Sequence, residues 1–167
     1  MDISKTMVAP MRVAWYCVVG EQPELHAWTT ITAWAKQAGL LDNDFPCRFF
    51  GFNNPNPTDE NPVYGYEVWV TVPPDIAEHD EIKLKDIAGG WYAATRTTLA
   101  QVMETWMNHQ AWQTWLETNH VRYDGSRHLL EEVLISKREI DTLISAAVDM
   151  DTIQLDLYLP IQASEVK

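Results

Sequence analysis

Short apolar runs along the chain predict a series of β-strands. The strongest run is YGYEVWVTV, from Tyr64 to Val72, which alternates between an apolar face and a mixed face and stops at two prolines. Further runs of strand type cover residues 11–19, 47–52, 82–87, 91–97 and 153–161. Successive side chains of a strand point to opposite faces, so these runs are typical of sheets with at least one buried face.

Longer segments carry large apolar residues at helical spacing. Pro23 to Ala38 contains such a stripe, which includes Trp28, and Gly39 after it is a typical helix stop. Leu99 to Thr118 repeats the pattern and predicts a second long helix. We expect an additional short helix over Lys137 to Val148.

The order strand, helix, strand, strand occurs twice. It predicts an α+β fold made of two pseudo-repeated β-α-β-β units, residues 11–74 and 82–161, which form a curved antiparallel sheet with two long helices and a central cleft. The cleft is expected between the helices, where the floor of the sheet is uncovered. A single domain would then cover residues 11–161, with a lead-in at 1–10 and a tail at 162–167.

Charge narrows the classes of partner. The chain has 12 Lys and Arg against 24 Asp and Glu, a formal net charge of -12, which disfavours direct binding of nucleic acid and favours a cationic ligand or a basic protein. Cys17 and Cys47 have no metal-ligand spacing, so we predict neither a metal nor a cofactor. No signal peptide or membrane-spanning run is evident, and a cytoplasmic location is expected.

Two adjacent acids lie inside the apolar segment RHLLEEVLIS, residues 127–136. In a strand, Glu131 and Glu132 would point to opposite faces, and both faces are mostly apolar. Whichever face is buried, one carboxylate is buried with it. The sequence leaves open which of the two faces inward.

Six motifs follow one another between Met11 and Ile161. They are FFGFNNPNP before YGYEVWVTVP, IAGGWYAA before a long helix, QTWLETN, EEVL and LYLPI. Their order resembles that of the GyrI-like small-molecule-binding family, the effector-binding domain of multidrug-sensing bacterial regulators, which also occurs as stand-alone proteins. The resemblance implies a cleft lined by aromatic residues, with a carboxylate near its centre that meets cationic lipophilic ligands.

In that family the acid belongs to a Glu-x-Tyr sequence near the C-terminus. Here the best match is Glu132-Val133-Leu134, in which Leu134 replaces the aromatic residue. Together with the aromatic residues of the predicted strands and helices, this gives the ligand-binding candidates. They are Glu132, Leu134, Trp28, Phe50, Phe52, Tyr66, Trp106, Trp112 and Tyr158.

A buried carboxylate loses hydration and needs a compensating partner. A flat cationic ligand would supply one, and aromatic faces would add cation–π attraction. The alternative is that Glu132 pairs with Arg96, Arg122 or Arg127, or lies in water at a strand end. Glu67 is expected to be a solvated, outward-facing acid, because its strand offers a fully apolar face for burial.

Three functions fit these observations. The first is a stand-alone sensor or sequestering protein for hydrophobic, cationic, aromatic small molecules, since the predicted domain begins near Met11 with no helix-turn-helix before it. The second is a metal-free hydrolase of strained cyclopropane-type electrophiles, in which Glu132 acts on water and Tyr158 or Tyr66 donates a proton. The third is inhibition of DNA gyrase, as by the namesake of the family, through an acidic surface.

Overall fold

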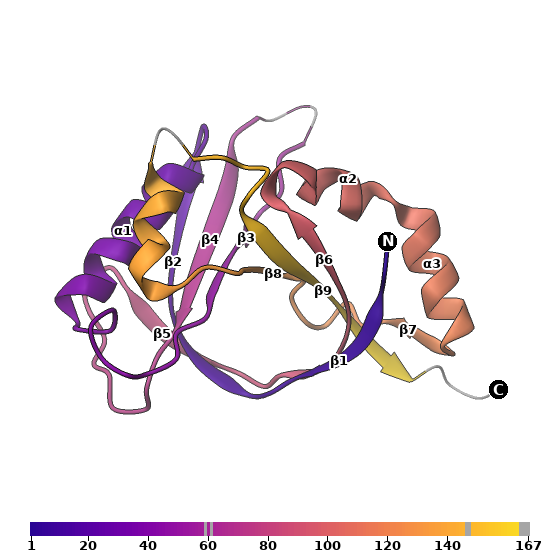
Figure 1. Cartoon of the computed structure of the whole chain (residues 1–167), viewed down its shortest axis with the longest axis horizontal. Helices are drawn as coiled ribbons and strands as arrows, with labels where there is room; N and C mark the ends of the chain where they lie inside the picture. The colour runs from indigo at the N-terminus through magenta and orange to yellow at the C-terminus, as the bar shows by residue number, and fades with distance from the viewer. Residues whose placement is uncertain (59, 61, 146–147, 164–167) are drawn as a thin grey trace. The chain divides into compact units, whose positions relative to one another are not determined.

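The computed structural model describes residues 1–58, 60, 62–145 and 148–163. Figure 1 shows its helices and strands. The chain divides into two units. Unit 1 consists of Met1–Pro10, Ala88–Glu132 and Asp149–Lys167, and unit 2 consists of Met11–Ile87 and Val133–Val148. Each unit combines antiparallel strands with helices, so the predicted α+β class is confirmed.

Unit 2 is a four-stranded antiparallel sheet with a helix on one face. Its elements are β2 (Met11–Gly20), α1 (Glu24–Gln37), β3 (Phe49–Asn53), β4 (Tyr64–Thr71), β5 (Lys83–Ile87) and the 3₁₀ helix η2 (Lys137–Ile144). The strand order is β3-β4-β2-β5. The amphipathic stripe of α1 packs on β2 and β4.

A glycine allows α1 to approach the sheet closely. A Cβ atom at Gly51 would lie 2.6 Å from Cζ2 of Trp28 and 2.6 Å from the hydroxyl oxygen of Tyr66. Tyr64, two residues earlier on the same face of β4, donates a hydrogen bond to Glu24 of α1. The face of β4 that carries Tyr64 and Tyr66 is therefore the helix face, and the face that carries Glu67 and Trp69 points away from α1.

Unit 1 has the same layered plan with different connections. Its elements are β1 (Ser4–Val8), β6 (Gly90–Thr98), the 3₁₀ helix η1 (Leu99–Gln101), α2 (Val102–Met107), α3 (His109–Thr118), β7 (Val121–Tyr123), β8 (Leu130–Val133, whose last residue belongs to unit 2) and β9 (Gln154–Ala163). The strand order is β1-β6-β9-β8, and β7 also pairs with β9. Ala93 and Ile161 of the sheet form one apolar cluster with Trp112 and Leu116 of α3, which defines the helix face of unit 1.

The second predicted helix is divided. The run from Leu99 to Thr118 forms η1, α2 and α3, and it is interrupted at Asn108, which has φ −76° and ψ 62°. The Asn108 side chain accepts a hydrogen bond from the backbone N–H of Ala111 and so caps α3. Among the described residues, no helix is long and apolar enough to cross a membrane.

The structure adds two strands to the predicted elements and changes the type of one helix. The predicted lead-in, residues 1–10, contains β1, which pairs with β6, and the additional strand β7 pairs with β9. The predicted short helix over Lys137 to Val148 is a 3₁₀ helix that ends at Ile144, and residues 146 and 147 lie outside the described part of the chain. Short strands such as β7 have too few residues for an alternating pattern to stand out.

Candidate functional site

Strand β8 sends its two neighbouring glutamates to opposite sides of unit 1. Glu131 accepts a hydrogen bond of 2.7 Å from the indole Nε1 of Trp106, which belongs to α2. Glu132 accepts a hydrogen bond of 2.7 Å from the hydroxyl of Tyr158, which belongs to β9. The alternation of the strand thus gives one carboxylate to the helix side and the other to the opposite side of the sheet.

The Glu132–Tyr158 pair is buried on the face opposite the helices. Tyr158 is paired in register with Ala94, whereas the next residue, Ala93, packs against α3 on the helix face. Glu132 is 8% exposed and Tyr158 is 6% exposed. Tyr92, on the same face, meets the Tyr158 ring edge to face, with 6.0 Å between centroids and an interplanar angle of 83°. A carboxylate and two phenol rings therefore share one buried region of unit 1.

A hollow of about 370 Å³ opens beside this pair. It is lined by the same sheet face, from Ser4 and Thr6 of β1 through Arg96 of β6 to Asp156 and Tyr158 of β9. Arg96 and Asp156 are partners in the register of β6 and β9. They form a bidentate ion pair, with nitrogen–oxygen distances of 2.7 and 2.9 Å. The lining is thus polar and charged at one end and aromatic at the other.

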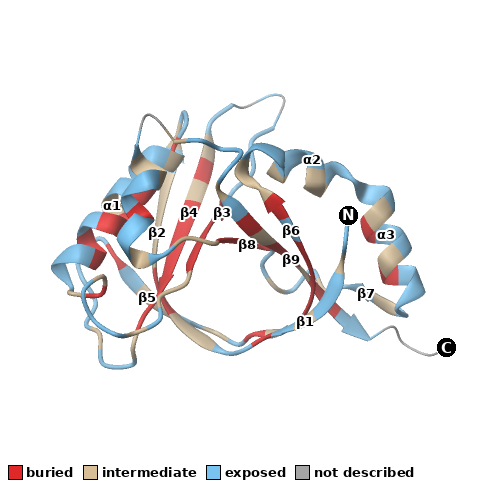
Figure 2. Cartoon of the chain, viewed as in Figure 1, coloured by how far each residue is buried: buried red, intermediate tan, exposed pale blue. Residues whose placement is uncertain are grey.

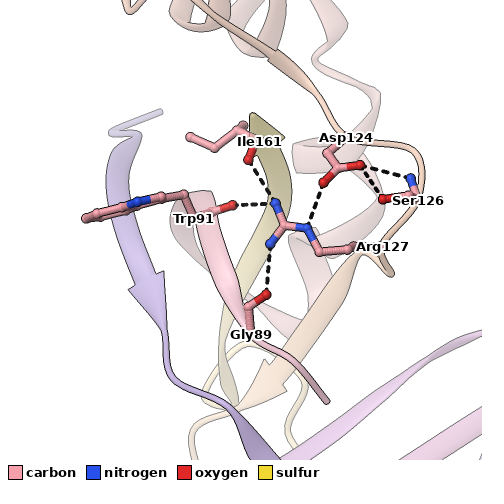
Figure 3. Close-up of polar contacts among 6 residues, drawn as sticks. All are labelled: Gly89, Trp91, Asp124, Ser126, Arg127 and Ile161. Atoms are coloured by element: carbon pink, nitrogen blue, oxygen red, sulfur yellow. Dashed lines mark hydrogen bonds and ion pairs between the residues drawn. The ribbon is translucent and has the colours of Figure 1, made fainter. Parts of the chain in front are cut away.

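Figure 3 shows the hydrogen bonds by which Arg127 anchors the sheet. Its guanidinium donates to the carbonyl oxygens of Gly89, Trp91 and Ile161 at 3.2, 3.0 and 2.8 Å, so it joins the ends of β6 and β9. Its centre lies 4.7 Å from the centroid of the Tyr92 ring. This contact holds Tyr92 in place beside Tyr158.

The same guanidinium also forms an ion pair with Asp124. The Nε–Oδ2 distance is 2.8 Å. Hydrogen bonds from Ser126 and from Arg127 lower the pKa of Asp124 to about 2. Of the arginines expected as alternative partners of Glu132, Arg96 forms its ion pair with Asp156 and Arg127 with Asp124, and the Glu132 charge also acts on Arg96.

The expectation for Glu67 was wrong. Glu67 is 3% exposed, and burial along β4 is nearly continuous from Glu67 to its end (Figure 2). The apolar face of β4 does pack on a helix, as expected. However, Phe52 and Trp69 cover the opposite face, with 5.0 Å between their ring centroids, so the carboxylate is enclosed there as well.

Glu67 is neutralised within unit 2. It forms an ion pair with Lys85 and accepts hydrogen bonds from the indole Nε1 of Trp69 at 2.5 Å and from the side-chain amide of Asn54 at 2.8 Å. Burial would raise the pKa of Glu67, but the bonds from Lys85, Trp69 and Asn54 outweigh it and leave the pKa below its usual value.

The other predicted aromatic residues fall into three groups. Trp28 and Tyr66 lie on the helix face of unit 2, as described above. Phe50 and Phe52 lie on its other face, and Phe50 has its ring centroid 6.0 Å from that of Trp69. Trp106 and Trp112 stack on the helix side of unit 1, with centroids 5.3 Å apart. Leu134 follows β8 and is half-buried.

Of the predicted site residues, the structure thus joins Glu132 directly to Tyr158, and Trp106 and Trp112 lie on the other face of that sheet. The sequence interpretation missed Tyr92 and Lys85, and it considered Arg127 only as a partner of Glu132. Tyr92 had a signal, since it lies in the IAGGWYAA motif. Lys85 had none, because a lysine on a short polar strand is most often solvated.

The fold and the enclosed carboxylates define the class of protein: an α+β effector-binding domain of the GyrI-like type. The family model of Cass2, described as integron-associated effector binding protein, matches residues 8–161, and the chain belongs to this family. The predicted resemblance is therefore confirmed. A comparison with curated proteins finds no match.

Solved structures share the fold at low sequence identity. An uncharacterized conserved protein from Listeria innocua is 14% identical, with a TM-score of 0.63, over 96% of this chain and 92% of that one. The C-terminal domain of EcmrR is 9% identical, with a TM-score of 0.64, over 97% and 98%. A hydrolase from Listeria innocua is 14% identical, with a TM-score of 0.60, over 96% and 91%.

Proposed function

We propose that this protein binds hydrophobic, cationic, aromatic small molecules, with Glu132 as the charged contact. Membership of an effector-binding family supports a small-molecule ligand in general. The observation that carries the specific proposal is the enclosed carboxylate of Glu132, which lies beside the phenol of Tyr158 on a face of unit 1 that its helices do not cover.

The reason for a cation is electrostatic. A carboxylate removed from water loses hydration energy, and a positive charge placed next to it is therefore favoured. A ligand cation next to Glu132 would supply that charge in a region of low dielectric. A neutral ligand of the same shape would gain only apolar contact.

The aromatic part of the ligand has a partner on the same face. Tyr158 lines the hollow with its phenol ring, and a cation over such a ring gains about 0.5–2 kcal/mol. The hollow of about 370 Å³ lined by Tyr158 is within the range of small-molecule sites, about 300–1,000 Å³.

A matched pair of ligands tests the proposal. N-methylquinolinium and 1-methylnaphthalene have nearly the same shape, and only the first is charged. We expect the native protein to bind the cation at least tenfold more tightly in a titration followed by tryptophan fluorescence. Glu132→Gln should remove this preference, because it keeps the shape and the hydrogen-bond acceptor but loses the charge.

The neighbouring acid provides the control. Glu131→Gln makes the same substitution one residue away, on the helix side of the sheet, and should leave the preference intact. Equal affinity of the native protein for both ligands, or loss of the preference in Glu131→Gln alone, would contradict the proposal.

A second candidate uses the same pair of residues. Glu132 and Tyr158 form an acid–phenol pair at 2.7 Å, and a structure described as a hydrolase shares the fold. Such a pair suits the addition of water to a strained cyclopropane: a C–O bond forms, a ring C–C bond breaks, Glu132 takes a proton from water and Tyr158 gives one to the carbon released. Tyr66, the other proton donor considered, lies at the α1 interface of unit 2.

Turnover separates the two candidates. The protein would be incubated with a cyclopropane-containing electrophile, and the hydrated product would be sought by mass spectrometry. A product formed by the native protein and not by Glu132→Gln, while the variant still binds the compound, would favour hydrolysis over binding alone.

A further inference from the structure

We propose that Trp15, Trp69 and Glu67 form a second site for organic cations in unit 2, and that Lys85 occupies it as a displaceable internal ligand. The external ligands would be small ammonium compounds, quaternary or primary. This site does not depend on Glu132, and it holds whether or not the proposed function is correct.

The anionic end of the site is already shaped for an ammonium group. The Glu67 carboxylate is 3% exposed and is held by the indole of Trp69 and the amide of Asn54. These two donors fix its orientation and remain when Lys85 is removed. The carboxylate would then present a buried negative charge whose geometry is set by other residues.

Two indole rings form the walls. Trp15 of β2 and Trp69 of β4 are partners in the register of the sheet, so their side chains lie on one face. The Lys85 ammonium lies 4.7 Å from the Trp15 ring centroid and 4.3 Å from the Trp69 ring centroid. Two tryptophan faces and a carboxylate around one ammonium are the elements of an aromatic cation cage.

Phe52 keeps this cage in shape. Its ring meets Trp69 almost at a right angle, at 85°, with centroids 5.0 Å apart. Trp69 is fully buried, at 0% exposure, so this wall is fixed by packing on several sides. A cage with a rigid wall can keep its form when its occupant changes.

The occupant enters from the edge of the sheet. β5, which carries Lys85, is the last strand in the order β3-β4-β2-β5. The Lys85 side chain is 27% exposed, while that of Glu67 is 4% exposed. The partly exposed lysine side chain thus marks the side from which it could leave the cage and a free ammonium compound could enter.

A tethered occupant competes with every free ligand. A group held on the same chain acts at an effective concentration on the order of millimolar or more. In the native protein, Lys85 therefore weakens the binding of free ammonium compounds. Removal of the lysine should therefore reveal the affinity of the cage. Loss of the carboxylate should abolish that affinity.

Choline and 3,3-dimethylbutan-1-ol are the probes, since they share a shape and only choline is charged. We expect Lys85→Ala to bind choline at least tenfold more tightly than the native protein does, with a change in tryptophan fluorescence, and to show no such gain for the alcohol. Lys83→Ala is the matched control, because Lys83 lies on the same strand and is paired in register with Trp15. It should behave as the native protein.

Two double variants locate the bound choline. Lys85→Ala with Glu67→Gln should lose the gain, and Lys85→Ala with Glu132→Gln should keep it. If the gain were lost with Glu132→Gln and kept with Glu67→Gln, choline would be bound at Glu132 and the second site would be refuted. Equal choline affinity in folded Lys85→Ala and the native protein would refute it as well.

A measurement on the native protein covers the case in which Lys85→Ala does not fold. Reductive methylation followed by mass spectrometry reports how accessible each lysine amine is. Saturating choline should increase modification of Lys85 at least threefold and leave Lys83 unchanged. No change at Lys85 would overturn the proposal.

Discussion

Glu67 in unit 2 and Glu131 in unit 1 both accept a hydrogen bond from a tryptophan indole, yet their pKa values move in opposite directions. Glu67 also meets the ammonium of Lys85, and its pKa is lowered. Burial of Glu131 raises its pKa to about 7, although the bond from Trp106 acts against this rise. An indole donor alone does not compensate for lost hydration, whereas an indole together with a cation does.

Glu132 extends the comparison to the proposed binding site. Its observed donor is the phenol of Tyr158, a neutral group like the indole of Trp106. Glu132 and Glu131 thus accept hydrogen bonds from a phenol and an indole, whereas Glu67 also meets an ammonium group. Under the two proposals, a ligand cation would approach Glu132 directly, whereas a cation in unit 2 would first have to displace Lys85.

The largest expected effect follows from removal of Glu67, the carboxylate that forms an ion pair with Lys85. Glu67→Ala should lower the free energy of unfolding by about 4 kcal/mol, since it leaves Lys85 and the Trp69 and Asn54 donors without their acceptor. Glu132→Gln, which keeps shape and acceptor, should cost less than about 1 kcal/mol. Urea unfolding measures both changes in the free energy of unfolding. Equal losses would show that the ion pair of Glu67 stabilises the protein no more than the charge of Glu132 does.

The pKa of Glu131 predicts a pH dependence with a definite sign. The unfolded side chain titrates near 4.5 and the folded one near 7, so the folded state holds the proton more tightly. This contribution to stability is fully present below about pH 4.5 and is lost as the pH rises through about 7. One pKa unit is 1.36 kcal/mol, so the full shift amounts to about 3 kcal/mol, which partial exposure reduces to about 2.

Glu131→Gln isolates that contribution from the rest of the protein. The free energy of unfolding would be measured at pH 5 and pH 8 for both proteins, and the native protein should lose about 2 kcal/mol more between these values than the variant. A variant with the same pH dependence would show that Glu131 is not the group responsible.

The sequence predicted the long elements of the fold well, because each has a repeated pattern. The alternating run of β4 and the helical stripe of α1 are found within one or two residues of their expected bounds. The division of the second helix was missed because its apolar spacing continues across Asn108. The signal was the asparagine itself, which favours a helix N-cap over a helix interior.

The site was only partly predictable for a related reason. Alternation along β8 predicts that Glu131 and Glu132 point to opposite faces of the sheet. Their partners in the structure, Trp106 and Tyr158, were both among the predicted site residues. Alternation along β4 gave the wrong result for Glu67, because pattern alone does not tell whether a second face is covered. The cation that makes its burial tolerable comes from Lys85, on a different strand.

The smallest expected effect concerns the neutral donor of Glu132. Tyr158→Phe removes one hydrogen bond to a buried carboxylate and keeps the ring, so it should lower the free energy of unfolding by about 1.5 kcal/mol. Tyr123→Phe, at a side chain that is 47% exposed, should stay within about 0.5 kcal/mol of the native value. If Tyr158→Phe were as mild as Tyr123→Phe, the phenol would not stabilise the Glu132 carboxylate. Glu132 would then no longer be an example of a buried acid stabilised by a phenol, and the comparison with the ammonium-paired Glu67 would fail.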